Sequence, residues 1–217
     1  MSTSASTSIR CNDFENTDQL IKYYDDWAKE YDKDTQVERG YIGPKVGAKK
    51  LVEFLEQFKF GTDCRILDVG SGTGLVGEEL KKLNYTNVDA LEPSEKSNDV
   101  ARGKGLYKKF FVELILPGKQ LGILPNSYDA VISIGVFTKG NAKAEGAMDE
   151  MVRVVKPGGL ICFSIREDVI FDKEYGYEEK MAQLIEGKAW KLLSRSLEMY
   201  HLTGDFFKCH MFVYQVL

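Results

Sequence analysis

The sequence predicts an α/β fold, in which a doubly wound, mostly parallel β-sheet is joined by a C-terminal antiparallel hairpin and an N-terminal helical lid. Three observations predict it. The apolar run Ile66–Val69 leads through a glycine turn into a helix. Further apolar runs, at residues 87–91 and 128–134, are each followed by a helical segment, as in β-α-β units. Two extended runs near the end of the chain flank a turn, which predicts the hairpin.

Length and the N-terminal composition indicate one domain, residues 17–217, preceded by a tail. A chain of 217 residues can bury roughly 70% of its unfolded surface, and no linker divides this one. The first residues are rich in Ser and Thr and contain no apolar segment. We therefore expect residues 1–16 to be disordered and to form neither a signal peptide nor a membrane span.

Composition and charge also limit the partners. Apolar residues make up 43% of the chain and charged residues 29%, and the net charge is −4. Such a chain has no overall attraction to polyanions, so we expect no nucleic-acid partner and no membrane. The four cysteines form no C-x-x-C pair, which indicates neither a zinc site nor a disulfide framework. We expect a cytoplasmic protein without a metal, and the sequence predicts no oligomeric state.

An amphipathic helix is predicted for Thr17–Tyr31. Its apolar and aromatic residues recur at spacings of three and four: Leu20, Tyr23, Tyr24, Trp27 and Tyr31. Such a face can pack on the core or form a lid over a ligand cleft, and both interpretations remain open at this point. A second amphipathic helix, residues 46–58, is expected to pack behind the first strand.

The glycine turn after the first strand is the best candidate for a ligand site. Glycines at 70, 72 and 74 leave no side chains between the backbone and a ligand, and the next helix begins there with free N–H groups. An anionic group could bind at this turn. A dinucleotide fingerprint would place a third glycine where this sequence has Leu75, so the match to a nicotinamide site is imperfect.

The whole string L-D-V-G-S-G-T-G, residues 67–74, resembles motif I of the class I S-adenosylmethionine-dependent methyltransferases, whose sheet is Rossmann-like. The resemblance implies that Asp68, Gly70, Ser71 and Gly72 contribute to an S-adenosylmethionine site. In that family the turn holds the methionine end of the cofactor.

An acidic residue at the end of the second strand should then bind the two ribose hydroxyls. Glu92, followed by Pro93, lies 22 residues after Gly70, close to the ~20 expected of such a contact. The third strand, Phe110–Leu114, ends in an acid. The resemblance implies that Glu113 and the backbone of Leu114 contact the adenine.

Later elements extend the resemblance nearly to the end of the chain. Tyr128–Ile134 is similar to the fourth strand of the family, whose end, Ile134, is expected to lie over the methionine end of the cofactor. A helix at about 144–155 and the string V-K-P-G-G-L-I resemble motif III, with a strand at 160–165. A helix near 178–186 and the hairpin runs 192–201 and 206–216, joined by a turn at 202–205, complete the prediction.

The words Y-D-D-W-A-K-E-Y-D and G-Y-I-G-P resemble the opening of the Williams-Beuren-region type of methyltransferase. That resemblance implies that residues 17–44 are a lid and that Trp27 and Tyr31 help to enclose the cofactor. Tyr41 belongs to the same expected lid. The acceptor pocket is then expected between Trp27, Tyr31, Phe137 and the stretch Arg166–Tyr177.

The sequence thus predicts a methyltransferase whose acceptor is a small molecule or a protein side chain, with a small molecule favoured. The expected wall is more aromatic than basic, which favours a small or partly apolar acceptor over a nucleic acid. Ile134–Phe137 replaces the N/D-P-P-Y/F tetrapeptide typical of enzymes that methylate exocyclic nitrogens of bases or glutamine. No residue is assigned a catalytic role, and His201 and His210 are interpreted as strand residues. The alternatives are a nicotinamide-dependent oxidoreductase and a cofactor-binding module without turnover.

Overall fold

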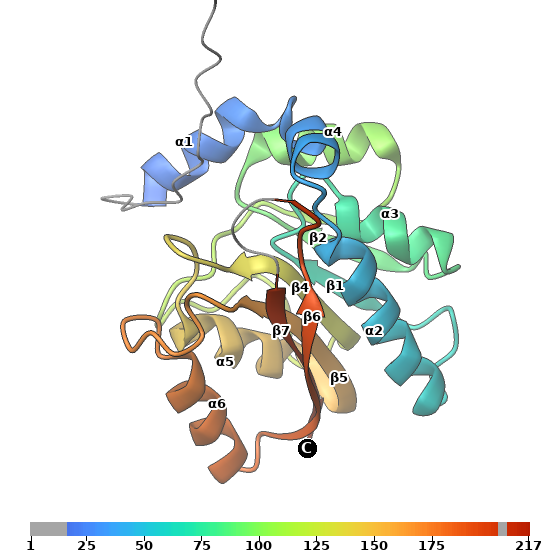
Figure 1. The fold of residues 1–217 in the computed structure, drawn as a ribbon. Coiled ribbons are helices and arrows are strands. Elements are labelled where there is room, and N and C mark those ends of the chain that lie inside the picture. Colours follow the sequence, from blue (N-terminus) through green and yellow to red (C-terminus); the bar gives the residue numbers. More distant parts are fainter. Residues whose placement is uncertain (1–16, 204–207) are drawn as a thin grey trace, which may run out of the picture.

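The computed structural model describes residues 17–203 and 208–217, and its centre is a seven-stranded sheet in the order β3-β2-β1-β4-β5-β7-β6 (Figure 1). The first five strands are parallel, and β7 runs antiparallel to both of its neighbours. Their bounds are β1 Ile66–Val69, β2 Val88–Leu91, β3 Phe110–Phe111, β4 Tyr128–Phe137, β5 Val155–Arg166, β6 Trp190–Met199 and β7 Lys208–Val216. The predicted α/β class and the mostly parallel sheet with an antiparallel hairpin are confirmed.

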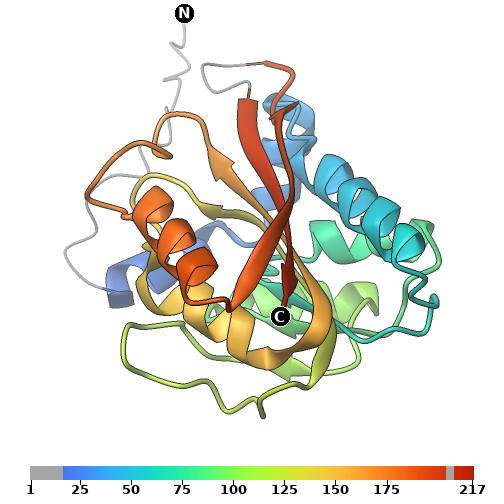
Figure 2. The ribbon, with the colours of Figure 1, turned by 90° about the horizontal axis from the view of Figure 1, so that it is seen from below.

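Helices cover both faces of the sheet, and Figure 2 shows α2 and α6 on opposite sides of it. Leu51 of α2 and Leu80 of α3 belong to one buried cluster, whereas Met148 of α5 and Met181 of α6 belong to the other. The helices are α2 Gly43–Gln57, α3 Leu75–Lys82, α4 Glu95–Lys104, α5 Ala144–Val154 and α6 Tyr177–Glu186. Two cores, one on each face, therefore hold the sheet.

Strand β1 shows why the apolar runs form central strands. All four of its residues are buried. Ile66 belongs to the core cluster on the α2 face and Leu67 to the cluster on the α5 face, as expected when successive side chains point to opposite faces. A strand buried on both sides is expected to be mostly apolar, and three of the four residues of β1 follow this pattern, with the buried Asp68 as the exception.

The N-terminal helix is shorter than predicted. Helix α1 spans Thr17–Trp27 and not Thr17–Tyr31, and a short π-helix, η1 Lys33–Glu38, follows it. The indole N–H of Trp27 donates to Oδ2 of Asp34 at 2.7 Å. Residues 28–30 form a turn, in which the Glu30 N–H donates to the Trp27 carbonyl at 3.1 Å, and this turn ends the helix.

The largest differences between predicted and observed strand bounds are at β3 and β5. Strand β3 has two residues and not five, because only Phe110 and Phe111 pair with β2. Strand β5 begins at Val155 and not at residue 160, and its register shifts where Tyr128 and Ala130 face Val155 and Leu160. The Pro-Gly-Gly turn is therefore a bulge inside this strand, with a φ of +85° at Gly158.

Residues 112–127 connect β3 to β4 without a helix. The connection is held by α5, since the Glu150 carboxylate accepts a hydrogen bond from the Leu121 N–H at 2.8 Å. The Arg153 guanidinium donates to the carbonyl of Ile123, also at 2.8 Å. The later part of the connection is thus held against α5. Its beginning, residues 113–117, lines a cavity.

Some predictions concern residues outside the described ranges. The tail at residues 1–16, Phe206 and the turn residues 204 and 205 lie there. Within the described ranges, no helix is long and apolar enough to cross a bilayer.

Candidate functional site

A cavity of about 380 Å³ opens at the carboxyl ends of the parallel strands, a volume within the range of small-molecule sites. Its wall is built from the glycine turn, the turn after β2, residues 113–117, the end of β4 and helix α1. The residues predicted from the sequence that line it are Tyr31, Gly70, Gly72, Glu92, Pro93, Glu113, Leu114 and Ile134. The structure thus brings together residues from five separate segments of the chain.

The glycine turn has two positions with different requirements. Gly70 and Gly72 have φ values of +69° and +51°, in the left-handed region that favours glycine. A Cβ at Gly70 would overlap the side chain of Val136, whereas a Cβ at Gly72 would meet no protein atom within 4 Å. Gly70 is therefore needed for packing, and the space beside Gly72 belongs to the cavity.

Glu92 places a carboxylate in the cavity wall beside that space. Its side chain is buried, and its two oxygens accept hydrogen bonds from the N–H groups of Gly72, at 3.0 Å, and Ser94, at 2.8 Å. Burial raises the pKa of Glu92 to about 7, although the two amide hydrogen bonds oppose the rise. Each oxygen retains a further lone pair, so the carboxylate can accept two hydroxyl groups from a vicinal diol.

Asp68 and Ser71 lie beside the turn but do not line the cavity. The Tyr107 hydroxyl donates to Oδ2 of Asp68 at 2.6 Å, while Oδ1 of this buried carboxylate has no hydrogen-bond partner. Burial raises the pKa of Asp68 to about 7, the Tyr107 hydrogen bond opposes the rise, and the charge of Glu92 adds to it. The buried Ser71 hydroxyl also has no partner. Both residues support the turn from behind.

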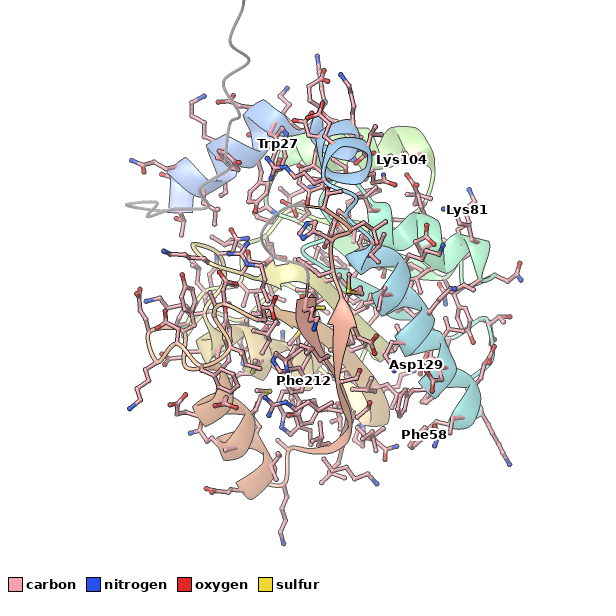
Figure 3. The ribbon with its side chains drawn as sticks, viewed as in Figure 1. Trp27, Phe58, Lys81, Lys104, Asp129 and Phe212 are labelled. Atoms are coloured by element: carbon pink, nitrogen blue, oxygen red, sulfur yellow. The ribbon has the colours of Figure 1, made fainter. Side chains whose placement is uncertain are left out.

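Trp27 and Tyr31 were predicted together but occupy different places. Tyr31 lines the cavity, whereas Trp27 does not. The Trp27 ring packs edge-on against the Tyr31 ring, with centroids 4.5 Å apart, and Figure 3 shows it at the upper end of the molecule. Trp27 therefore supports the wall and is not part of it.

The expected acceptor wall is partly wrong. Phe137 lines the cavity, but no residue of Arg166–Tyr177 does. Tyr175 and Tyr177 are instead buried in the core cluster on the α5 face, and the Gly140 N–H donates to the Tyr175 hydroxyl at 2.8 Å. That stretch thus holds the loop after β4 from behind.

Tyr41, a further expected lid residue, is buried against Tyr200, with their hydroxyls 3.3 Å apart. The backbone N–H groups of Ile42 and Gly43 donate to the carbonyl of Tyr200. Residues 41–43 are thus tied to the end of β6, away from the cavity wall formed by α1.

Sequence reasoning missed the apolar part of the wall. These residues come from α1, from the start of the β3–β4 connection and from the loop after β4: Leu20, Ile21, Tyr24, Ile115, Leu116, Pro117 and Ala142, the last next to the polar Asn141. Leu20 and Tyr24 stood in the predicted aromatic face, which was a usable signal. The string I-L-P carried none, because three apolar residues in a loop have no periodicity.

The ionisable residues of the cavity wall, within the described ranges, include no histidine or cysteine. They comprise Tyr24, Tyr31, Glu92, Glu113, Lys143 and Glu145. Neither histidine lines the cavity: His201 forms an isolated bridge with Tyr41, and His210 lies in β7, where burial lowers its pKa. Within residues 17–203 and 208–217 no three His, Cys, Asp or Glu side chains are arranged to hold a metal ion. The arrangement offers hydrogen-bond acceptors and a shaped apolar enclosure.

Comparison with known proteins connects this geometry to a family. The family model described as "Methyltransferase domain" matches residues 67–163, a range that contains the glycine turn, Glu92 and β4. Methyltransferase-like protein 27 of Homo sapiens is 30% identical over 148 residues, which are 68% of this chain and 58% of that protein. The chain thus spans little more than half the length of this relative.

For two further similar proteins, the match covers a larger share of the other protein's length. Malonyl-[acyl-carrier protein] O-methyltransferase 2 of Ilyobacter polytropus is 28% identical over 202 residues, covering 83% of this chain and 74% of that protein. The crystal structure of magnesium protoporphyrin IX methyltransferase from Synechocystis PCC 6803 with bound SAM superposes with a TM-score of 0.59 at 15% identity. It covers 81% of each chain. This last likeness concerns the fold.

Proposed function

We propose that this chain, which belongs to the class I S-adenosylmethionine-dependent methyltransferases, transfers the methyl group of that cofactor to a small, partly apolar acceptor. One observation carries the proposal. The cavity is continuous between the two cofactor turns and an apolar wall from α1 and residues 115–117. Cofactor and acceptor would therefore share one enclosed space, as a direct transfer requires.

The residues present fit the cofactor. The open space beside Gly72 lets a ligand approach the backbone, and Glu92 offers two acceptor oxygens for the ribose hydroxyls. Leu114 and Glu113 would hold the adenine, and Ile134 would lie at the methionine end. The Glu113 carboxylate accepts from the Gly122 N–H at 3.0 Å, so its adenine contact would add to an existing hydrogen bond.

When bound, the cofactor supplies a methyl group on a sulfonium, with a neutral thioether as the leaving group. The protein then has to align the acceptor and keep water away. Such positioning can lower a barrier by about 7–11 kcal/mol when the geometry is ideal. Helix α1 contributes Leu20 and Tyr24 to the enclosure, and Tyr31 closes it beside the glycine turn.

The wall also indicates the class of acceptor. Among the residues that the structure describes, its apolar side chains outnumber the charged ones, and Lys143 is its single basic residue. A nucleic-acid substrate would need several cations for its phosphates, which this wall does not provide. A cavity of this volume that must also hold the cofactor leaves room only for a small molecule or one side chain.

Calorimetric titration with S-adenosylmethionine, S-adenosylhomocysteine and NAD tests the cofactor. We expect binding of the first two and none of NAD; the reverse would support a nicotinamide-dependent oxidoreductase. Incubation of a cell extract with methyl-labelled cofactor, followed by ultrafiltration, tests the acceptor. Label should appear in the small-molecule filtrate. Label only on retained protein contradicts the small acceptor, and binding without any transfer would indicate a module without turnover.

A further inference from the structure

Residues 17–38, called here the lid segment, cover the cavity and contact the core chiefly through Tyr31 and Ala28. Helix α1 contains no buried residue, and in the whole lid segment Ala28 and Thr35 are the buried positions. Yet Thr17, Leu20, Ile21, Tyr24 and Tyr31 all line the cavity. A segment with so little buried apolar surface gains little stability from packing, so its closed position must depend on other contacts.

Asp25 provides the first such contact. One oxygen of its carboxylate accepts hydrogen bonds from the Ser94 hydroxyl, at 2.6 Å, and from the Lys96 N–H, at 3.1 Å. Ser94 is the N-cap of α4, and it stands two residues after Glu92. Asp25 therefore joins α1 to the turn that carries the cavity carboxylate, and a carboxylate is favoured at the N-terminus of a helix.

Asp32 provides the second contact, on the glycine turn. Its Oδ1 accepts from the Thr73 hydroxyl and its Oδ2 from the Lys104 ammonium, both at 2.5 Å. Figure 3 shows Lys104 and Trp27 at the same upper end of the molecule. Lys104 also pairs with Glu78 at 2.6 Å, so one lysine bridges the lid segment, α4 and α3.

The two contacts converge on Glu92. Its carboxylate is held by the N–H groups of Gly72 and Ser94. Asp32 binds the residue directly after Gly72, and Asp25 binds Ser94 itself. Each aspartate thus accepts a hydrogen bond from the turn that supplies one of the two N–H donors to Glu92.

We infer that Asp25 and Asp32 are positioning residues that couple closure of the lid segment to the conformation in which the two turns hold Glu92 for the cofactor. The inference rests on the proposed function, because Glu92 is the residue expected to bind the ribose. A ligand that fixes the two turns stabilises the closed lid, and a closed lid fixes the turns. Since coupling is reciprocal, loss of either aspartate loosens both.

Helix α1 contains a matched control. Asp26 lies next to Asp25 but points to solvent, where it pairs with Lys22 at 2.8 Å on the same helix. Asp26→Ala removes the same charge from the same helix and touches neither turn. A difference between Asp25→Ala and Asp26→Ala therefore reports the contact with Ser94 and Lys96, and not the charge or the helix propensity.

The first experiment is amide hydrogen exchange on the full chain without ligand. In Asp25→Ala and Asp32→Ala, exchange in the lid segment should accelerate about tenfold, the factor expected when a hydrogen bond to a charged group is lost. Strands β1, β4 and β5 should keep their protection, as should the lid segment of Asp26→Ala. Unchanged lid exchange in both variants overturns the inference. Accelerated exchange in the central strands as well also overturns it, because the aspartates would then support the whole fold.

The second experiment measures dissociation of S-adenosylhomocysteine by the fluorescence of Trp27, the other tryptophan, Trp190, being fully buried in the core. Dissociation should be about tenfold faster in Asp25→Ala and Asp32→Ala than in Asp26→Ala. Asp25→Asn, which keeps an acceptor for Ser94, should recover part of the loss. If amide exchange in the lid segment is faster in Asp25→Ala and Asp32→Ala but S-adenosylhomocysteine dissociates at the rate of Asp26→Ala, the inferred coupling is overturned. If the parent chain does not bind this ligand, the proposed function fails, while the exchange experiment still decides whether the aspartates hold the lid segment.

Discussion

Val136, near the end of β4, packs directly on the backbone of Gly70, so that any Cβ at Gly70 would overlap it. This contact joins the strand expected at the methionine end of the cofactor to the first glycine of the turn. Gly70→Ala should therefore lower the stability of the fold, by about 1–3 kcal/mol from overpacking in addition to the strain at φ +69°. Denaturant unfolding measures this. Gly105→Ala, with φ +60° and open space, is the control for strain alone.

Gly72→Val should act on the ligand and not on the fold. Its Cβ meets open space on the side of the cavity, so the cost to the fold is the left-handed strain of about 1–2 kcal/mol. The valine would occupy the space beside Glu92, and S-adenosylhomocysteine binding should fall below detection by calorimetry. Gly105→Val carries comparable strain, at φ +60°, at a position that does not line the cavity, and should bind normally. A folded Gly72→Val that binds as tightly as the parent contradicts the assignment.

Glu92→Ala should weaken cofactor binding by about 1.5–3 kcal/mol, the range for hydrogen bonds to a charged group. The carboxylate is expected to accept both ribose hydroxyls, and alanine accepts neither. Glu95→Ala, which removes an exposed glutamate paired with Arg102, should leave the affinity unchanged. Equal affinities for the two variants would place the ribose elsewhere.

Stability without cofactor should fall as pH rises from about 4 to about 7. Burial raises the pKa of Asp68 and Glu92 to about 7, so the folded protein holds these protons at pH values where the unfolded chain has released them. The stabilisation is present below the unfolded values and is lost as pH passes through 7. Thermal unfolding between pH 5 and pH 8.5, as compared with Asp68→Asn, measures it: the variant should show a shallower decline. An increase in stability over this range contradicts the raised values.

Trp27→Ala should affect the site through Tyr31. The Trp27 ring supports the Tyr31 ring, which lines the cavity, and its N–H holds Asp34. Once an acceptor is known, we expect turnover to fall more than cofactor affinity. Val37→Ala, at an exposed position of η1, should change neither quantity. A larger loss of affinity than of turnover would place Tyr31 on the cofactor.

Short sequence patterns were enough to predict the part of the site that directly follows the central strands. The glycine turn and Glu92 follow central strands whose apolar runs are readable in the sequence, and parallel strands bring their carboxyl ends to one edge. Strand β4 was found for the same reason. These residues meet because of the sheet, so knowing the strands was enough to place them.

The remaining wall depends on how separate segments pack, which periodicity does not reveal. Ile115 and Leu116 lie in a connection that has no regular structure, and the backbone of Leu116 and Pro117 packs closely on Gly146. From the sequence alone, Tyr175 and Tyr177 could face a pocket or the core, and in the structure both are buried in the core. Trp27 was predicted at the cofactor from the resemblance of its segment to a methyltransferase opening, whereas its indole N–H binds Asp34 and its ring packs on Tyr31.

The connection between β3 and β4 separates two roles that a helix there would have combined. Its later residues are anchored by Glu150 and Arg153, and its first residues form the apolar wall of the cavity. Substitutions at Ile115 and Leu116 can therefore change the shape offered to an acceptor without altering a strand, a helix or the glycine turn. For engineering, we expect that exchange of Ile115 and Leu116 alone would change the acceptor, provided that Glu113 and Leu114 of the same loop are kept for the adenine.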